Sequence, residues 1–155
     1  MALRLIREIG DEVLTKRAKE VKAMTPRTEK LIADMLETMY ESEGVGLAAP
    51  QVGILKRIVV IDIGDGPLVL VNPVILKTEG EQTGPEACLS VPGKSGVVTR
   101  PNHVKIRAYD EYMEPYELEA DELLARAICH ECEHLHGHLY VERVEGELMD
   151  VEEED

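Results

Sequence analysis

The chain has 155 residues, enough for one domain whose buried core needs no disulfide support. Its net charge of −14 argues against nucleic-acid binding, and the absence of any run of about 18 apolar residues argues against a membrane span. It has only three cysteines, and the first eight residues, MALRLIRE, are too charged for a secretory signal, so we expect a cytoplasmic protein.

The predicted elements are short strands and two helices. After a loose N-terminal arm with a helical turn near residues 11–14, Thr25 and Pro26 form a helix start, a capping residue followed by proline. We expect this helix to end at Gly44 and a second helix to run from Asp121 to Gly137. Short β-branched runs predict strands at residues 57–63, 68–71, 74–79, 96–99, 103–109 and 116–120, with a hairpin at 64–66.

These elements predict an α+β fold with mostly antiparallel short sheets packed around the second helix, the other helix lying near the N-terminus. We expect residues 1–155 to form a single domain. Residues 145–155 contain seven acids and no bases, so we expect this segment to be a solvated, frayed tail.

The second helix carries the sequence His130-Glu131-Cys132-Glu133-His134, an H-E-x-x-H pattern. An α-helix turns by about 100° per residue, so the two histidines share one face and can bind one metal ion. With a glutamate beside them, they are typical of metal-dependent hydrolases. Periodicity puts Glu131 and Glu133 at similar angles on either side of the histidines, so it does not say which would be the base.

At least one further protein ligand is needed, because catalytic tetrahedral sites usually have three. The metzincin pattern would require a histidine at position 140, which is Tyr140. A thermolysin-like glutamate would require a later helix, and the 21 residues after His134 (155 − 134) predict none. Cys88, in the block Glu86-Ala87-Cys88-Leu89-Ser90, is the upstream candidate.

Three sequence blocks follow one another along the chain: GVGLAAPQ at residues 44–51, EACLS at 86–90 and CHECEH at 129–134. They resemble the motifs of the peptide deformylase family, G-apolar-G-apolar-A-A-x-Q, E-G-C-L-S and Q-H-E-x-D-H, and the similarity extends along essentially the whole chain. The resemblance implies an enzyme that removes the N-formyl group from the formylmethionine of newly made polypeptides and releases formate. The chain departs from these motifs at Ala87, Cys129 and Glu133.

The resemblance also implies a metal site. Cys88, His130 and His134 would hold one ion per chain, Fe²⁺ in the native state, with Zn²⁺, Ni²⁺ or Co²⁺ able to substitute. The helical wheel directs Cys129 and Cys132 away from the histidines, so buried packing is favoured over a redox pair or a zinc knuckle. Expected partners are N-formylmethionyl peptides of nascent chains, with transient ribosome association, no nucleic acid and no membrane.

Individual roles follow from the same resemblance. Glu131 would be the base, while Gln51 and the backbone N–H of Leu89 would form the oxyanion hole. Glu133 would then orient a ligating imidazole. Glu86 and Arg100 would hold the cysteine loop; alternatively, they are ordinary surface charges. The residues expected to contact substrate are Val45, Gly46, Ala87, Leu123 and Ala127.

Two histidines outside the pattern, His136 and His138, are expected at the surface. Two other functions are alternatives to deformylation. The first is a zinc peptidase of the H-E-x-x-H kind, and the second is an acidic metal-binding module without turnover. The intact Glu131 and Gln51 argue against the second.

Overall fold

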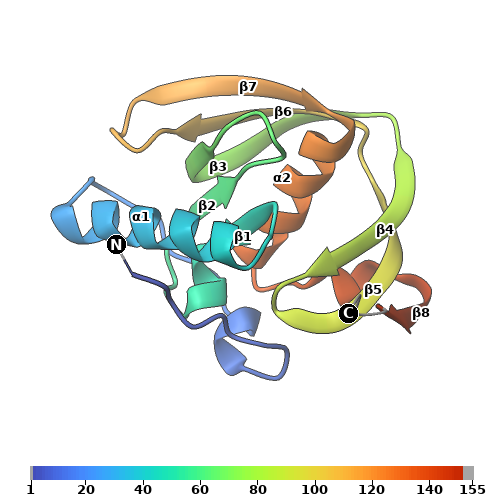
Figure 1. The fold of residues 1–155 in the computed structure, drawn as a ribbon. Coiled ribbons are helices and arrows are strands. Elements are labelled where there is room, and N and C mark those ends of the chain that lie inside the picture. The colour runs from blue at the N-terminus through green and yellow to red at the C-terminus, as the bar shows by residue number, and fades with distance from the viewer. Residues whose placement is uncertain (1, 152–155) are drawn as a thin grey trace.

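The computed structural model describes residues 2–151 (Figure 1). Helix α1 (Pro26–Glu41) begins as the sequence predicts: the Thr25 side chain accepts a hydrogen bond from the Thr28 N–H at 3.2 Å, and Pro26 occupies the first turn. It ends three residues before Gly44, whose N–H donates to the Met39 carbonyl at 3.0 Å. Helix α2 (Glu122–His134) likewise ends three residues before Gly137.

Every strand pair within the two described sheets is antiparallel, so the predicted α+β class is confirmed. The larger sheet has the order β1 (Gly46–Ala48), β2 (Ile58–Ile61), β3 (Leu68–Glu79), β6 (His103–Tyr109) and β7 (Pro115–Asp121). The smaller sheet has the order β4 (Gln82–Cys88), β5 (Val91–Arg100) and β8 (Glu145–Asp150). The described residues also form short 3-10 helices, labelled η1 (Glu12–Thr15), η2 (Ala49–Val52) and η3 (Tyr140–Arg143).

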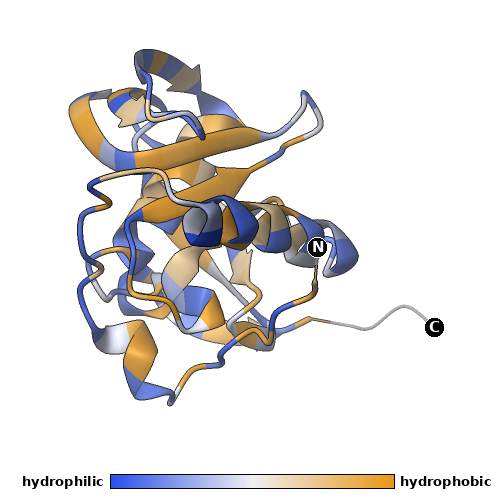
Figure 2. Ribbon diagram, turned by 90° about the vertical axis from the view of Figure 1, so that its left-hand side faces the viewer, coloured by the Kyte–Doolittle hydropathy of each residue, from blue (hydrophilic) through white to orange (hydrophobic). Residues whose placement is uncertain are grey.

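Strand β2 lies at the centre of the core, and all four of its residues are buried. Alternate side chains of a strand point to opposite faces, and here each face has its own cluster. Val59 and Ile61 belong to the cluster that contains Ile128 of α2. Ile58 and Val60 belong to the cluster built by α1. In Figure 2 the central strands are coloured mostly hydrophobic, while many of the outer turns are hydrophilic.

Strand β3 runs without interruption where two separate strands were expected. Asn72 adopts a positive φ of 51° and pairs its side-chain amide with the backbone of Val21, through bonds of 2.9 and 2.8 Å. The register with β6 shifts between Val71 and Val74. The Asn72-Pro73 pair therefore forms a bulge inside one strand and does not end it. Strand β4 was not predicted, because its sequence, QTGPEAC, lacks the β-branched apolar residues that are typical of strands.

The prediction of a frayed tail is wrong for residues 145–150. They form the exposed strand β8, which pairs with the edge of β5. Repulsion between its acidic side chains disfavours an ordered strand in this segment alone, but the edge of β5 provides backbone groups that pair with it. Lys94 also pairs with Asp150, and Gly96 leaves space that Val144 and Leu148 fill. Residues 152–155 lie outside the described residues.

No helix among residues 2–151 has both the length and the apolar character that crossing a bilayer requires.

Candidate active site

The structure brings together the three candidate metal ligands. His130 and His134 lie one turn apart on α2, and Cys88 is the last residue of β4. Their ligand atoms all lie within 4.8 Å of one another, and the Cys88 Sγ is 3.4 Å from the His134 Nε2. One thiolate and two imidazoles match the three protein ligands of a catalytic tetrahedral site, which keeps its fourth position open. This group can bind a metal ion.

Glu86 orients His130. Its Oε1 lies 2.7 Å from the His130 Nδ1, and its carboxylate also accepts hydrogen bonds from Arg100, at 2.9 Å from both Nε and Nη2, and from the Arg126 Nη1, at 2.6 Å. Burial raises the pKa of Glu86, but hydrogen bonds from Arg100 and His130 more than offset this and lower it to about 2. An ionised Glu86 requires a proton on the His130 Nδ1, which leaves Nε2 available as a metal ligand.

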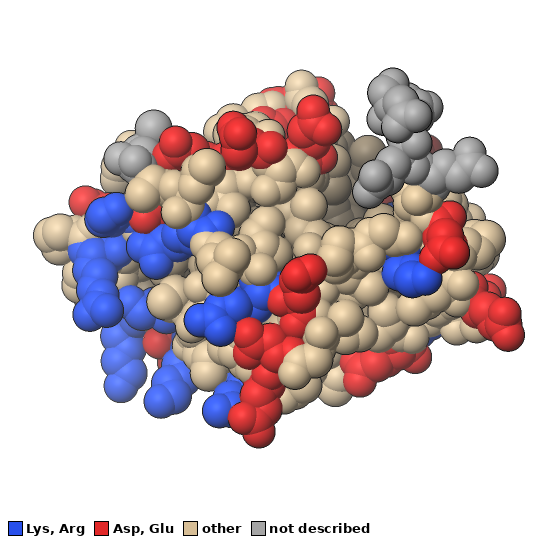
Figure 3. All heavy atoms as spheres, turned by 60° about the horizontal axis from the view of Figure 1, so that its bottom comes forward, with Lys and Arg blue, Asp and Glu red and all other residues tan. Residues whose placement is uncertain are grey.

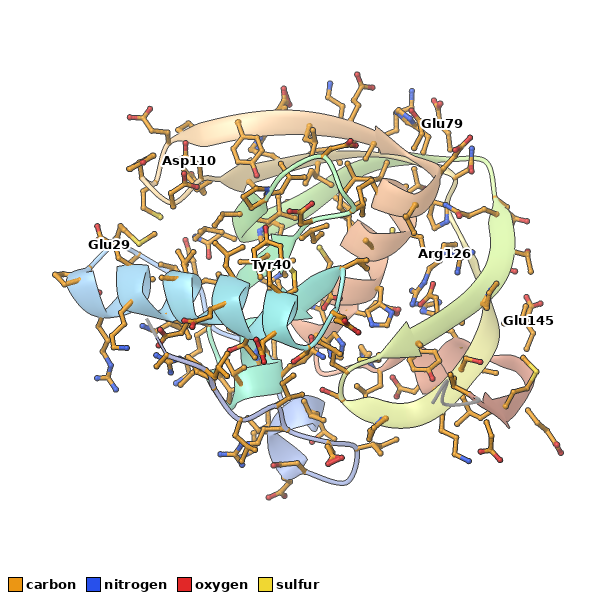
Figure 4. All side chains as sticks on the ribbon, in the orientation of Figure 1. Glu29, Tyr40, Glu79, Asp110, Arg126 and Glu145 are labelled. Carbon is orange, nitrogen blue, oxygen red and sulfur yellow. The ribbon has the colours of Figure 1, made fainter. Side chains whose placement is uncertain are left out.

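Arg126, labelled in Figure 4, extends from α2 toward β4, where its Nη1 donates to the Gly84 carbonyl at 3.4 Å. Glu86 and Arg100 are only 6% and 4% exposed, so the expected pair is confirmed and the surface-charge alternative is wrong. The proposed role of Glu133 is also wrong, since its carboxylate pairs with Arg100 and Arg143 and not with an imidazole. Strand periodicity gave no signal for the contact between Glu86 and His130, because β4 was not predicted and its register with β5 shifts between Glu86 and Cys88.

Glu131 faces the two histidines from within the cavity. Its Oε1 lies 4.0 Å from the His134 Nε2, and its Oε2 lies 4.0 Å from the His130 Nε2. Burial raises the pKa of the Glu131 carboxyl to about 7. Its Oε1 is buried and has no hydrogen-bond partner among residues 2–151, whereas Glu133 is held by two arginines. A carboxyl that titrates near neutral pH suits a general base, so the geometry favours Glu131 over Glu133.

Gly46 serves a purpose that the sequence did not reveal. A Cβ at this position would lie 2.6 Å from the Glu131 Oε2, closer than real Cβ contacts allow. Strand β1 therefore approaches α2 closely because residue 46 has no side chain. Gly46, which the resemblance places among the substrate contacts, thus also makes room for the Glu131 carboxylate.

Gln51 is 1% exposed, and its side-chain amide is oriented by three contacts. Its Oε1 accepts a hydrogen bond from the Ala48 N–H at 2.9 Å. Its Nε2 donates to the Ser90 Oγ at 3.0 Å and lies 3.4 Å from the Cys88 Sγ. The amide protons therefore point toward the cysteine. Sequence reasoning missed Ser90 as an orienting group, although it belongs to the same block as Cys88.

A cavity of about 540 Å³ opens beside these groups. Val45 and Leu123 are about half exposed, at 47% and 50%, and provide apolar surface at its edge. Leu89, in the turn that follows Cys88, also lines it. All five residues expected to contact substrate line this one cavity: Val45, Gly46, Ala87, Leu123 and Ala127.

The remaining residues of the motif region lie where expected. Cys129 and Cys132 are buried in the core on α2, and burial raises the pKa of these thiols to about 11 and 12, so their packing role is confirmed. His136 and His138 are exposed. Tyr140, which excluded a metzincin, stacks on His130 with ring centroids 5.7 Å apart, a contact that sequence reasoning missed. A buried carboxylate beside an oriented Cys-His-His group in an open cavity defines a metal-dependent hydrolase.

Comparison with known proteins identifies the family. Residues 3–148 match the model of the family described as polypeptide deformylase. The peptide deformylase of Agathobacter rectalis is 66% identical, with 100% of this chain and 98% of that protein covered. The solved peptide deformylase of Thermotoga maritima is 40% identical with a TM-score of 0.91, covering 93% of this chain and 99% of that one. That of Synechococcus elongatus, in complex with actinonin, is 46% identical with a TM-score of 0.89, covering 91% and 78%.

The chain therefore belongs to the polypeptide deformylase family. It is an enzyme that removes the formyl group from the N-terminal formylmethionine of newly made polypeptides and releases formate, and the function expected from the motifs is confirmed.

The support that Glu86 gives to His130 can be tested by Glu86→Gln. We expect metal affinity to fall by about 10–100-fold, the usual effect of removing a group that orients a ligating histidine. Isothermal titration with Zn²⁺ measures this, with circular dichroism to verify folding. Glu133→Gln is the matched control, because it also loses a partner of Arg100 without touching His130. Wild-type affinity in Glu86→Gln would contradict the assigned role.

Proposed function

We propose that Cys88, His130 and His134 hold the metal ion and that Glu131, Gln51 and the Leu89 N–H act on the formyl group around it. One observation carries this proposal: the three ligand atoms converge within 4.8 Å, and the Glu131 carboxylate lies 4.0 Å from both histidine Nε2 atoms. No other described group combines three converging ligands with a buried carboxylate that lacks a partner.

When bound, the ion supplies Lewis acidity, which acidifies water and polarises a carbonyl. Glu131 takes the proton of the attacking water and then delivers it to the departing amine nitrogen. The Gln51 Nε2 and the Leu89 N–H donate hydrogen bonds to the oxygen of the formyl group as negative charge develops on it. Because Ala48 and Ser90 already orient the Gln51 amide, little reorganisation accompanies this step.

The methionine side chain of the substrate fits the apolar part of the cavity. Val45, Leu123 and Ala127 present hydrocarbon surface there, and thioether side chains adapt well to such surroundings. Gly46 and Ala87 line the same cavity, where the substrate backbone would pass. Ala87 is exposed, so its methyl group can be accommodated without burial in the protein core.

The native ion is proposed to be Fe²⁺, with Zn²⁺, Ni²⁺ or Co²⁺ able to replace it. A thiolate with two imidazoles binds all of these ions, so affinity alone does not discriminate between them. Activity of the Fe²⁺-loaded enzyme is expected to decay in air, because the ion and its thiolate both oxidise. Loading with Ni²⁺ or Co²⁺ should slow the decay. Equal half-lives for the three forms, measured by formate release after timed exposure to air, would contradict an oxidisable iron–thiolate centre.

Residues 1–155 are proposed to form one catalytic domain, which the family match over residues 3–148 supports. Since the substrate is the N-terminus of a chain still being made, we also propose a cytoplasmic location and a transient association with the ribosome.

Substrate choice tests the proposed geometry. Formate release from a short formylmethionyl peptide should be readily measured, while the acetyl version of the same peptide should react at least ~10²-fold more slowly. The acetyl methyl group would occupy space between the ion, Gln51 and Leu89, and an error of about 1 Å in such an arrangement costs about 10²-fold in rate.

Comparable rates for the two peptides would indicate a general amidase. Cleavage of internal peptide bonds without formate release would favour the zinc peptidase instead.

A further inference from the structure

A second cavity, of about 610 Å³, lies on the opposite side of α2 from the candidate active site. We call it the rear cavity. Cys129 and Cys132 form part of its wall, and Val74 and Ile75 of β3 contribute apolar surface. Nothing in the proposed reaction uses it. Its charged lining residues are Arg17, Arg57, Arg100, Arg143 and Glu133, with His136 beside them.

This lining is cationic in a chain whose net charge is −14. Glu133 is the one acid among the described lining residues, and it is already paired with Arg100 and Arg143. Neither Arg17 nor Arg57 forms an ion pair within the part of the chain that the structure describes, although the charge of Glu20 acts on Arg57. On the face that Figure 3 presents, Lys and Arg gather toward one end, and most of the charged side chains elsewhere are acidic.

The Arg57 guanidinium group has an N–H donor without an acceptor among the described residues. Its Nη1 is buried without a hydrogen-bond partner within the described part of the chain. Arg17 and Arg57 line the same cavity. Burial lowers the pKa of Arg57 and the charge of Arg17 lowers it further, while the charges of Cys132 and Glu20 act in the opposite direction. Burying an N–H group without an acceptor and placing two like charges together both cost free energy, which an anion between them would recover.

The backbone holds these cations in place. Arg57 donates its N–H to the Lys19 carbonyl at 2.9 Å, and its own carbonyl accepts the Asn72 N–H at 2.8 Å. The N-terminal arm that carries Arg17 is therefore tied to the start of β2. The two guanidinium groups come from segments 40 residues apart (57 − 17), and tertiary hydrogen bonds keep those segments together.

We propose that the rear cavity binds a small oxyanion, a phosphate group in preference to a carboxylate, between Arg17 and Arg57. A guanidinium group presents a planar fork of N–H donors that matches both kinds of oxyanion. Two unpaired guanidinium groups favour the doubly charged phosphate over a singly charged carboxylate. Val74 and Ile75 leave room for an apolar group attached to it, so a small organic phosphate is the class of ligand that uses the whole cavity.

Inorganic phosphate is the first probe, titrated into the metal-loaded enzyme at constant ionic strength and followed by calorimetry. We expect saturable binding of one phosphate in this cavity and a rise in the melting temperature, since a ligand of the folded state stabilises it. Arg17→Gln and Arg57→Gln should each weaken binding by roughly 10-fold or more, the scale of one charge-assisted hydrogen bond. Arg17 is exposed, so its replacement keeps the test valid even if Arg57→Gln folds poorly.

Arg107→Gln is the matched control, because it removes the same charge from an exposed position on β6 outside the cavity. It should bind phosphate like the wild type, and Arg17→Gln should retain deformylase activity. Acetate and phenyl phosphate, titrated in parallel, should bind more weakly and more tightly than phosphate, respectively. Absence of saturable binding, or equal weakening by Arg107→Gln and Arg17→Gln, would overturn the proposal. Acetate binding as tight as phosphate would overturn the preference for phosphate.

Discussion

Replacing Glu131 by Gln is expected to lower kcat by at least ~10²-fold, the usual scale for a positioned acid–base group. Metal content should stay near one ion per chain, because Glu131 lies beside the ligand atoms and is not one of them. The isosteric amide preserves the close fit against Gly46 but cannot accept the proton of the attacking water. Formate release under saturating formylmethionyl peptide measures kcat, and atomic absorption measures the bound metal.

Glu133→Gln is the control, since Glu133 lies two residues along the same helix and, among residues 2–151, forms ion pairs with Arg100 and Arg143 alone. We expect it to retain most of the activity, with a modest loss of stability. A large loss in Glu133→Gln together with near-normal turnover in Glu131→Gln would show that the base has been assigned wrongly.

Replacing Cys88 by Ala is expected to abolish tight metal binding and, with it, activity. The site would keep only two imidazoles from one helix, whereas catalytic sites of this type use three protein ligands. The comparison variant replaces both Cys129 and Cys132 by Ala, which removes the same type of side chain from the core. That variant should unfold at a lower temperature, because it loses packing, yet bind one metal ion.

Metal titration and thermal melting of both variants separate these outcomes. If the double variant lost the metal and Cys88→Ala kept it, Cys129 and Cys132 would be the true ligands, and the deformylase mechanism proposed here would fail. If all variants bound metal equally, none of the cysteines would be a ligand.

Local patterns in the sequence were sufficient for the two helices and for the position of the histidines. Capping by Thr25 and Pro26 is a short-range interaction, so the start of α1 follows from neighbouring residues alone. The i, i+4 spacing of His130 and His134 needs only the geometry of a helix. The order and separation of the three blocks carried the resemblance to a family, and with it Cys88 and Gln51 as candidates.

The roles of the individual carboxylates depended on tertiary contacts. Periodicity left Glu131 and Glu133 equivalent, and what separates them is the environment that distant segments provide. β1 leaves space at Gly46 for Glu131, while Arg100 and Arg143 take Glu133. In the same way, Glu86 becomes the partner of His130 only because β4 passes beside α2.

Strand β8 shows the same limit for secondary structure. Three of its six residues are acids and all six are exposed, so its composition predicts a solvated tail. Pairing depends on a free edge of β5, which is more than 40 residues earlier in the chain (145 − 100 = 45). Strand formation is governed by available partners more than by intrinsic preference. Neighbouring residues thus determined the helices and the spacing of the two histidines, while the resemblance of the three blocks to a family supplied Cys88 as the third candidate ligand. The orientation of each catalytic group and the edge strand depended on long-range contacts, which only the folded chain supplies.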